Sequence, residues 1–429
     1  MTAVYDRPQT ELSATAKTRH YDLVIVGGGI VGLTLASALR QSGLKLAIVE
    51  AQTPQQAASR DRAYAFSLTS ADIFKQLGLW EEVGPRITHF QKVRLSDGAY
   101  PVVVNFRPQN LGTESVYHAA EHRVLMQALQ ASLVDCPTID YWAPASLETV
   151  EYGEQTALCE IRYDDQACHC TTDLIVAADG ARSRLREQAQ ISTFGWKYWQ
   201  SCITTVLETE KFHANIAYER FWPSGPFAIL PLPDGRCQIV WTAPHAEAEA
   251  MLELTPEAFI AELQQRYGKQ MGRLKMLTQP RLFPVRLMHS HHYVQPHLAL
   301  IGDAAHGCHP VGGQGLNMGI RDAAALAEVL MAAHQHSEAL GNLRVLKRYE
   351  RWRKRENWLV LTMTDVLNRS FSNRWLPLVW ARRLGIVLLE YLPPLKWLAL
   401  TIMTGRFGRS PNVTLSAAES DDFSRKNLC

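Results

Sequence analysis

The chain reads Asp22-Leu-Val-Ile-Val26-Gly27-Gly-Gly-Ile-Val-Gly32 near its start, and this stretch decides the fold. The short apolar run 22–26 is typical of a buried parallel strand, and residues 30–41 have the apolar spacing of a helix. A second apolar run, 45–49, ends at Glu50. Strand, glycine turn, helix and strand together predict a βαβ unit of the dinucleotide-binding type.

Each glycine of that turn, and the acid after it, can have a physical role in binding a dinucleotide. Gly27 permits the tight turn, Gly29 lets the backbone approach a pyrophosphate, and Gly32 lets the helix pack closely on the strand. Glu50 can accept hydrogen bonds from both ribose hydroxyls, and its charge disfavours a 2′-phosphate and hence NADP at this site. A glycine turn alone can be purely structural, but here the strand, helix and acid accompany it.

Two further strand-turn-helix stretches extend this pattern. Residues 298–301 run into Gly302-Asp303 and a glycine-dense loop, and a helix is expected to open near Leu316. Backbone N–H groups and a helix N-terminus at such a loop favour an electron-rich or anionic group. Residues 173–189 contain Asp179-Gly180 at a strand end, where simple helix capping is the alternative reading. Three such turns fit a doubly wound sheet whose carboxyl edge faces one redox cofactor.

The middle and end of the chain differ from this α/β pattern. Residues 204–207, 227–230 and 238–242 are expected to be strands of an inserted antiparallel sheet, with a tight turn at 233–235. Residues 256–275 are expected to be helical, as is the arginine-rich chain after about residue 345. The apolar stretch 384–403, broken at Pro393-Pro394, fits either an interfacial helix pair or a helical cap packed on the cofactor domain.

Composition narrows the class of protein. A net charge of +2 over 429 residues and the lack of a basic run with aromatics argue against nucleic acid as a partner. Eight scattered cysteines and no secretory signal predict reduced thiols and a cytoplasmic location, and no apolar run is long enough to predict a membrane span. No metal site is expected, since His306 and His309 lack ligand partners at suitable spacing, and His289-x-His291-His292 is expected at an exposed strand edge or turn.

Several blocks together resemble one enzyme family. They are Gly27 to Gly32, Asp61-Arg-Ala-Tyr-Ala-Phe-Ser67, Glu121-His-Arg123-Val-Leu, Asp179-Gly180, Glu219-Arg-Phe221, Gly302 through Asp322, and Tyr349-Glu-Arg-Trp-Arg353. Across roughly residues 20–405 the chain resembles the flavoprotein aromatic hydroxylases of the para-hydroxybenzoate hydroxylase type, most closely the branch that acts in ubiquinone biosynthesis. Two departures are Gly313, where that branch usually has alanine, and the aromatic-rich stretch 196–199.

The resemblance implies bound FAD and a set of residues that hold it. Glu50 would bind the adenosine ribose, Asp303 the ribityl–phosphate part, and the loop 312–317 the isoalloxazine ring. The expected cofactor-binding residues are Gly27, Gly29, Gly32, Glu50, Arg62, Arg123, Asp179, Asp303, Gly312, Gly313, Gln314, Gly315, Leu316 and Asn317. His309 and Pro310 would lie near the ring and are the only catalytic candidates, and the residues themselves reveal no convincing acid or base.

The expected fold is therefore α/β, with a doubly wound FAD-binding domain, an inserted antiparallel β-sheet substrate domain and a C-terminal helical region. We assign residues 21–90, 113–195 and 285–345 to the first, 91–112 and 196–284 to the second, and 346–409 to the third. Residues 1–20 are expected to be a flexible tail and 410–429 a disordered one.

The resemblance also implies a reaction. NAD(P)H would visit transiently, because there is no second glycine fingerprint, and O2 would give a flavin C4a-hydroperoxide that hydroxylates a phenol, most plausibly a prenylated quinone precursor. Peripheral membrane association would deliver such a substrate. The alternatives are another flavoenzyme on this scaffold, such as a prenyl reductase or a halogenase (whose Trp-x-Trp-x-Ile-Pro element is missing), or a flavin-binding subunit of a quinone-synthesising complex.

Overall fold

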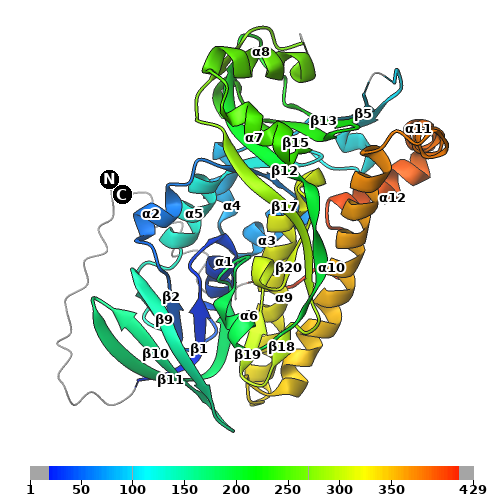
Figure 1. Cartoon of the computed structure of the whole chain (residues 1–429). Helices are drawn as coiled ribbons and strands as arrows, with labels where there is room; N and C mark the ends of the chain where they lie inside the picture. Colours follow the sequence, from blue (N-terminus) through cyan, green and yellow to red (C-terminus); the bar gives the residue numbers. More distant parts are fainter. Residues whose placement is uncertain (1–18, 99, 269, 415–429) are drawn as a thin grey trace.

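A computed structural model describes residues 19–98, 100–268 and 270–414, and one of its two large sheets is built on the expected βαβ unit (Figure 1). The strand order of this sheet is β18-β19-β11-β1-β2-β8, and β10 and β9 extend it from β11. Strands β19, β11, β1, β2 and β8 run parallel to one another, and β18 and β10 pair antiparallel with β19 and β11. The bounds are β1 Arg19–Val26, β2 Leu46–Val49, β8 Ile139–Trp142, β9 Ala145–Tyr152, β10 Ala157–Tyr163, β11 Gln166–Ala177, β18 Val294–Gln295 and β19 Leu298–Leu300.

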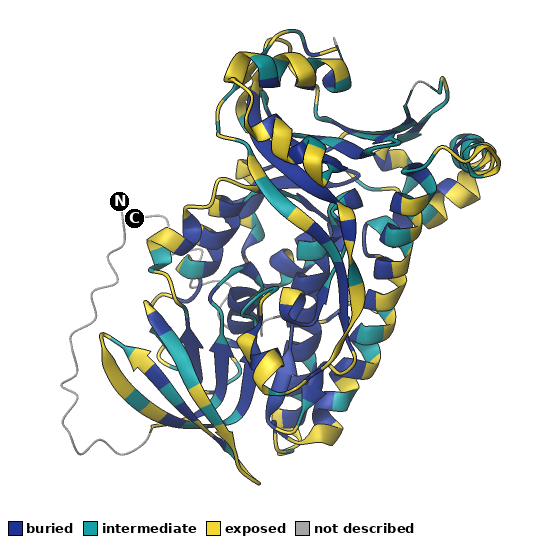
Figure 2. Ribbon diagram, in the orientation of Figure 1, coloured by how far each residue is buried: buried dark blue, intermediate teal, exposed yellow. Residues whose placement is uncertain are grey.

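The apolar run of β1 explains its central place. Leu23, Val24 and Ile25 are completely buried, as expected of a parallel strand whose two faces are both covered. Helix α1 (Ile30–Leu39) packs against α9 (Gln314–Gln335) and α5 (His122–Ala131). In Figure 2, α9 is mostly dark blue, which shows that this long helix lies inside the protein.

The inserted sheet is larger than the sequence predicted. Its order is β20-β17-β12-β15-β14-β13-β5-β6, with β16 beside β12. The bounds are β5 Lys92–Asp97, β6 Val103–Phe106, β12 Thr193–Thr209, β13 Ile216–Trp222, β14 Gly225–Pro231, β15 Arg236–Pro244, β16 Leu274–Met276, β17 Arg281–Ser290 and β20 His306–Gly307. The three predicted strands lie within β12, β14 and β15. The pairing of β12 with β17 carries the sheet past the predicted boundary at residue 284.

Helices and a small third sheet complete this part of the chain. Helix α8 ends at Tyr267 and residues 274–276 form a strand, so the predicted helix over 256–275 was too long. The third sheet is β3-β7-β4. Its bounds, and those of the remaining helices here, are β3 Ala63–Phe66, β4 Thr88–His89, β7 His118–Glu121, α2 Pro54–Ala58, α3 Leu68–Gln76, α4 Trp80–Val83, α6 Arg184–Gln188, α7 His245–Leu252 and α8 Pro256–Tyr267.

The C-terminal region is helical, as predicted. Helix α10 (Leu343–Phe371) lies along α9, and α11 (Leu376–Tyr391) and α12 (Pro393–Met403) follow it in orange and red in Figure 1. The proline pair separates α11 from α12, and the two axes are bent by 100°. Among the described residues no single helix has the length and hydropathy to cross a membrane, and only this bent pair passes that test together.

The chain ends differ from the predicted tails where they are described. Residues 19 and 20 belong to β1 rather than to a tail. Val413 is buried, and the backbone N–H groups of Asn412 and Val413 donate to Glu328 and Gln76, so order extends beyond the predicted limit at residue 410. Residues 1–18 and 415–429 lie outside the described residues.

A buried carboxylate, that of Asp322 on α9, ties the β19 loop to both long helices. One oxygen accepts from the Gly302 N–H at 3.1 Å and from His306 Nε2 at 2.5 Å. The other accepts from Arg353 Nε at 2.8 Å and from Asn357 Nδ2 at 3.0 Å, both on α10. Burial alone would raise the pKa of Asp322, but His306 and Arg353 outweigh it and hold that pKa well below its usual range.

Removing the buried cation Arg353 tests how much the paired carboxylate of Asp322 contributes to the stability of the fold. Arg353 is completely buried against Asp322, so Arg353→Ala leaves an uncompensated charge inside the protein. We expect the free energy of unfolding to fall by about 3–5 kcal/mol in urea titrations. Arg348, also on α10, forms an exposed ion pair with Glu338. Arg348→Ala should therefore lower the free energy of unfolding by less than about 1 kcal/mol. Equal losses in the two variants would contradict a special role for Asp322.

Candidate active site

The predicted turns do meet at one edge of the parallel sheet. Strands β19, β11, β1 and β2 are consecutive neighbours in the same direction. Gly302-Asp303, Asp179, Gly27 and Glu50 each follow the end of one of these strands. The structure therefore brings four segments that are far apart in sequence to a single carboxyl edge, the usual ligand edge of doubly wound sheets.

The glycines of the first turn have distinct surroundings. Gly27 has a φ of +111°, and a Cβ there would lie 2.3 Å from the carbonyl oxygen of Ala178. A Cβ on Gly32 would lie 2.0 Å from the carbonyl oxygen of Gly27, so the helix could not approach the strand as it does. A Cβ on Gly29 would meet open space. Two of these glycines thus serve the turn and its packing, and Gly29 borders the space that a ligand can use.

Two carboxylates flank this turn with unused hydrogen-bonding capacity. Glu50 Oε2 accepts from the Gly28 N–H at 2.7 Å and Oε1 from the Gln52 N–H at 2.9 Å, which leaves each oxygen a further lone pair. Asp179 is half-buried, burial raises its pKa, and its Oδ1 is buried without a hydrogen-bond partner among the described residues. Asp303 is exposed on the turn after β19.

The glycine loop ends in an open helix N-terminus. A 3-10 turn (Val311–Gly313) leads into α9, and Gly313, with a φ of +62°, takes the N-cap position. No side chain caps this end and no acidic residue lies in its first turn. Its N–H groups and the positive end of the helix dipole therefore remain for an outside acceptor. The helix begins at Gln314, two residues before the predicted start, because left-handed Gly313 ends the loop there.

Two polar side chains of this loop point into the protein. Asn317 is buried, its Oδ1 accepts from the Ser67 N–H and Ser70 Oγ, and its Nδ2 donates to the Ala65 and Gly313 carbonyls, each at 2.8 Å. Gln314 Nε2 donates to the Met403 carbonyl at 3.0 Å. These hydrogen bonds hold the start of α9 against the segment 65–70 and the end of α12, and the contacts of these two residues with the cofactor stay predictions.

The two predicted arginines differ in their surroundings. The Arg62 guanidinium lies 5.1 Å from the ring centres of both Tyr64 and Phe283, so it bridges the segment before β3 and the inserted sheet. Arg123 is exposed in the first turn of α5 and makes no hydrogen bond or ion pair with any described residue. Arg62 therefore has a defined position beside the second sheet, whereas Arg123 does not.

His309, the predicted catalytic candidate, is completely buried in the loop. Its Nδ1 accepts from the Val311 N–H at 3.2 Å, and its ring meets that of Tyr198 edge-on with centres 5.1 Å apart. Burial lowers its pKa to about 3, so the ring is neutral and the proton lies on Nε2. Nε2 has no partner among the described residues. His309 is thus a neutral donor and no base, and Pro310 beside it opens the 3-10 turn.

Sequence reasoning gave no role to Glu219, although it quoted this residue within a motif. The side chain lies half-buried on β13 without a hydrogen bond or ion pair to any described residue, and burial raises its pKa to about 8. Its signal was the alternation along β13, where Glu219 shares a face with Ala217 and Phe221, two buried apolar residues. A carboxylate on an apolar face marks a candidate functional acid.

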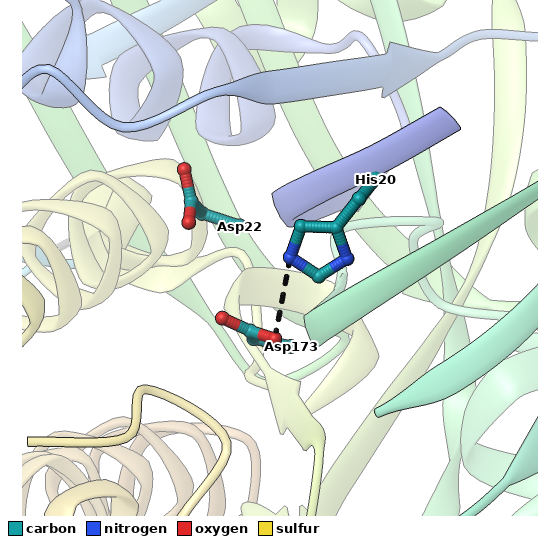
Figure 3. Close-up of side chains that lie close together, drawn as sticks. All are labelled: His20, Asp22 and Asp173. Carbon is teal, nitrogen blue, oxygen red and sulfur yellow. Dashed lines mark ion pairs between the residues drawn. The ribbon is translucent and has the colours of Figure 1, made fainter. Parts of the chain in front are cut away.

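Other polar clusters lie away from this edge. His289 was expected at an exposed strand edge, but it is buried on β17 and its Nε2 lies 2.9 Å from the Tyr293 hydroxyl. Figure 3 shows His20, Asp22 and Asp173 at the opposite, amino end of β1, where His20 Nε2 lies 3.5 Å from Asp173 Oδ1. Two cavities of about 490 and about 530 Å³ are lined by none of the predicted site residues.

Residues 20–364 match the family model described as the FAD binding domain. The chain belongs to this family. Ubiquinone hydroxylase UbiL of Rhodospirillum rubrum is 36% identical over 91% of this chain and 91% of that protein. The 3-demethoxyubiquinol 3-hydroxylase of Escherichia coli is 32% identical over 90% of this chain and 98% of that protein.

A solved structure shares the fold. The crystal structure of p-nitrophenol 4-monooxygenase PnpA from Pseudomonas putida superposes with a TM-score of 0.78 at 17% identity, over 92% of this chain and 100% of that one. The family and these relatives confirm FAD as the cofactor, the predicted fold class and an oxidoreductase of the FAD-dependent monooxygenase type.

Proposed function

We propose that this enzyme hydroxylates the aromatic ring of a phenolic, prenylated quinone precursor, with NAD(P)H as the electron donor and O2 as the oxygen source. The observation that carries the proposal is the match of residues 20–364 to the FAD-binding family. Relatives that this chain matches along nearly their whole length are named as ubiquinone-type hydroxylases. Bound FAD supplies the redox and oxygen chemistry.

The residues at the carboxyl edge fit FAD. Open space at Gly29 suits the pyrophosphate, Glu50 suits the ribose hydroxyls, and the unpartnered Oδ1 of Asp179 suits a hydroxyl donor of the cofactor. The uncapped start of α9 favours negative charge on a ring placed before it. The remaining predicted contacts, Arg123 among them, stay predictions.

The inserted sheet supplies the wall opposite the loop. Gln238 on β15 accepts from the Ala63 N–H at 2.6 Å and donates to the Ala63 carbonyl at 2.8 Å, which fixes this sheet against β3. Apolar clusters on both sides of the contact exclude water. Excluding water protects oxygen chemistry from unproductive loss of peroxide.

Consumption of NAD(P)H by the yellow holoenzyme tests this function. We expect oxidation to accelerate when a prenylated phenol is added, and product formed under oxygen-18 gas to carry one labelled hydroxyl. The same phenol without its prenyl chain serves as the matched control and should stimulate less. Oxidation that no phenol stimulates, or a label that comes from water, would remove the proposal.

Glu50→Ala tests the cofactor site itself. Loss of a charged acceptor for a buried hydroxyl pair should cost about 1.5–3 kcal/mol, which is roughly ten- to a hundredfold in the dissociation constant of FAD measured by flavin fluorescence. Asp173→Asn, at the amino end of the same sheet, should leave FAD affinity unchanged. Unaltered affinity in Glu50→Ala would refute the assigned contact.

We also propose that α11 and α12 dock on a membrane surface, where a polyprenyl substrate dissolves. Their outer face is apolar: the exposed fractions are 68% for Trp375, 70% for Trp380 and 71% for Tyr391. Their inner face packs on the protein through Ile386 and Leu400. The inner face fits a helical cap packed on the protein, and the exposed aromatic residues of the outer face support the interfacial reading, because aromatic residues suit a lipid–water interface.

The basic residues of this stretch also fall into two groups, one buried against the protein and one exposed. Arg382 and Lys396 are not at the surface, because Arg382 pairs with Asp97 at 3.0 Å and Lys396 with Glu390 at 2.8 Å. Arg383 and Arg406 have side chains more than a third exposed. The second pair, whose carboxylate partners Asp97 and Asp72 lie at 3.5 Å, is therefore the more accessible to anionic headgroups.

Removing apolar side chains from the outer face should weaken this docking. We expect the double variant Trp380→Ala, Leu384→Ala to bind anionic liposomes at least about tenfold less tightly in sedimentation assays, since each large side chain contributes about 1.5–3 kcal/mol when buried. Trp358→Ala, which removes an exposed tryptophan from α10, should bind as the wild type does. Unchanged binding of the double variant would exclude α11 as the docking face.

A further inference from the structure

One face of the inserted sheet looks toward the glycine loop, and we call it the inner sheet face. On β13 it carries Ala217, Glu219 and Phe221, which alternate with outward-facing residues. Glu219 pairs with Ala228 on β14, and Ala228 pairs with Val240 on β15, so these three side chains form one row across the sheet.

The neighbours of Glu219 along β13 fix its position relative to the loop. Ala217 shares a buried apolar cluster with Ala65. A Cβ on Gly313 would lie only 2.5 Å from the Cβ of Ala65, so these two backbones are in close contact. Phe221, on the other side of Glu219, shares a buried cluster with Val311 of the loop. Glu219 therefore lies between a residue that clusters with Ala65, the neighbour of Gly313, and a residue that clusters with Val311. Its side chain shares their face of the sheet, which is the face toward the segment 311–313.

The next row of the inner sheet face contains Cys202, whose pKa responds to the charges around it. Cys202 on β12 is buried, which raises the pKa of its thiol to about 12. Arg62 lowers that pKa and Glu219 raises it, so both groups lie within electrostatic reach of Cys202. Arg62 nonetheless forms no ion pair with Glu219, and its guanidinium lies over the Phe283 ring of the same row.

The remaining charged groups on this face are already paired. Asp97 on β5 stands beside Phe221 in the register, and it binds Arg382 at 3.0 Å and Arg383 at 3.5 Å. His309, in the loop, is neutral. Glu219 is therefore the one carboxyl group that the described part of this face leaves without a partner.

A half-buried acid without a partner is costly for a folded protein unless a ligand satisfies it. A phenol presents an O–H donor that fits a carboxylate. Burial raises the pKa of Glu219 to about 8, which brings it close to the pH at which an enzyme's general base works best. The neutral Nε2–H of His309 in the loop is also without a partner among the described residues.

We propose that Glu219 accepts a hydrogen bond from the ring hydroxyl of the substrate and takes up its proton, which makes Glu219 a catalytic residue. The O–H bond breaks, its electron pair stays on the ring oxygen as phenolate, and Glu219 holds the proton as the neutral acid. The phenolate ring is more electron-rich and hence more reactive toward an electrophilic oxygen. This inference rests on the proposed aromatic hydroxylase function.

The pH dependence follows from the protonation state. Below about pH 8 the free enzyme holds Glu219 as the neutral acid, which cannot accept a proton, and above that pH it is a carboxylate. The value of kcat/KM should therefore rise with pH and level off above about 8, because kcat/KM reports groups of the free enzyme.

The experiment uses the holoenzyme with 2-geranylphenol and its O-methyl ether as probes. Binding is followed by the change in flavin absorbance, and turnover by NAD(P)H oxidation, from pH 6 to about 9. Wild type should bind the phenol at least about tenfold more tightly than the ether at high pH. Glu219→Gln keeps a hydrogen-bond acceptor but no base, so it should lose the pH-dependent rise and about a hundredfold in kcat/KM.

Two further variants make the result decisive. Glu208→Gln removes an exposed carboxylate from β12 of the same sheet and should behave as wild type. Glu219→Asp keeps the acid and should keep a rise with pH, at a shifted midpoint. If Glu219→Gln does not retain FAD, the test falls to Glu219→Asp. A rise of kcat/KM with the same midpoint pH as in the wild type would then overturn the assignment.

The outcomes distinguish a failure of the role of Glu219 from a failure of the proposed hydroxylase function. Suppose that the wild-type enzyme responds to the phenol and that Glu219→Gln shows the same pH profile and the same preference for the phenol over the ether. That result overturns the role of Glu219 but not the proposed function. A wild-type enzyme that neither binds nor responds to any phenol overturns the proposed function, and with it this assignment.

Discussion

The buried carboxylate of Asp322 is the interaction on which the rest of the site depends. It binds the first N–H of the β19 turn, an imidazole of β20 and two side chains of α10, while its own backbone belongs to α9. An ionised group inside a protein is tolerated only when its lone pairs are used and opposite charge is close, and both conditions hold here. Consequently the turn after β19 and the two long helices cannot shift independently of one another.

A second set of hydrogen bonds extends this constraint to the glycine loop. Asn317 joins the start of α9 to the segment 65–70, and Gln314 joins it to the end of α12. Both side chains hold the loop against the protein, and no side chain caps the N-terminus of α9. A rigid loop of this kind can hold fixed dipoles toward a charge that develops on a bound ring, without the reorganisation that water would need.

The contact between the two sheets then sets the chemistry. The neutral histidine of the loop meets the ring of Tyr198, and the unpartnered acid on the inner sheet face stands between buried alanine and phenylalanine residues. Apolar walls strengthen each remaining polar interaction, because little water screens it. The outer face of α11 and α12 has the opposite arrangement, with its charges paired inside and its aromatic side chains outside.

Local pattern alone was sufficient for the cofactor half of the protein. The turn of Gly27, Gly29 and Gly32, the acid at the end of β2 and the period of the apolar residues are local properties of the chain, and they predicted the parallel sheet, its ligand edge and a bound dinucleotide. The resemblance to the flavoprotein hydroxylases then predicted that this dinucleotide is FAD. The length of the second sheet was beyond such reasoning, since β12 and β17 are long only because they pair with each other across a wide separation in the chain.

The tertiary structure alone decided which side chains face the reaction. Glu219 is an unpartnered acid because its neighbours Ala217 and Phe221 pack into apolar clusters, and Arg382 leaves the surface because Asp97 and three backbone carbonyls of residues 370–373 bind it. Burial, charge pairing and the direction of a side chain depend on neighbours that are distant in sequence, and no local period encodes them. The sequence by itself therefore determined the cofactor and the fold class, and packing determined the acid, the donor and the apolar surface.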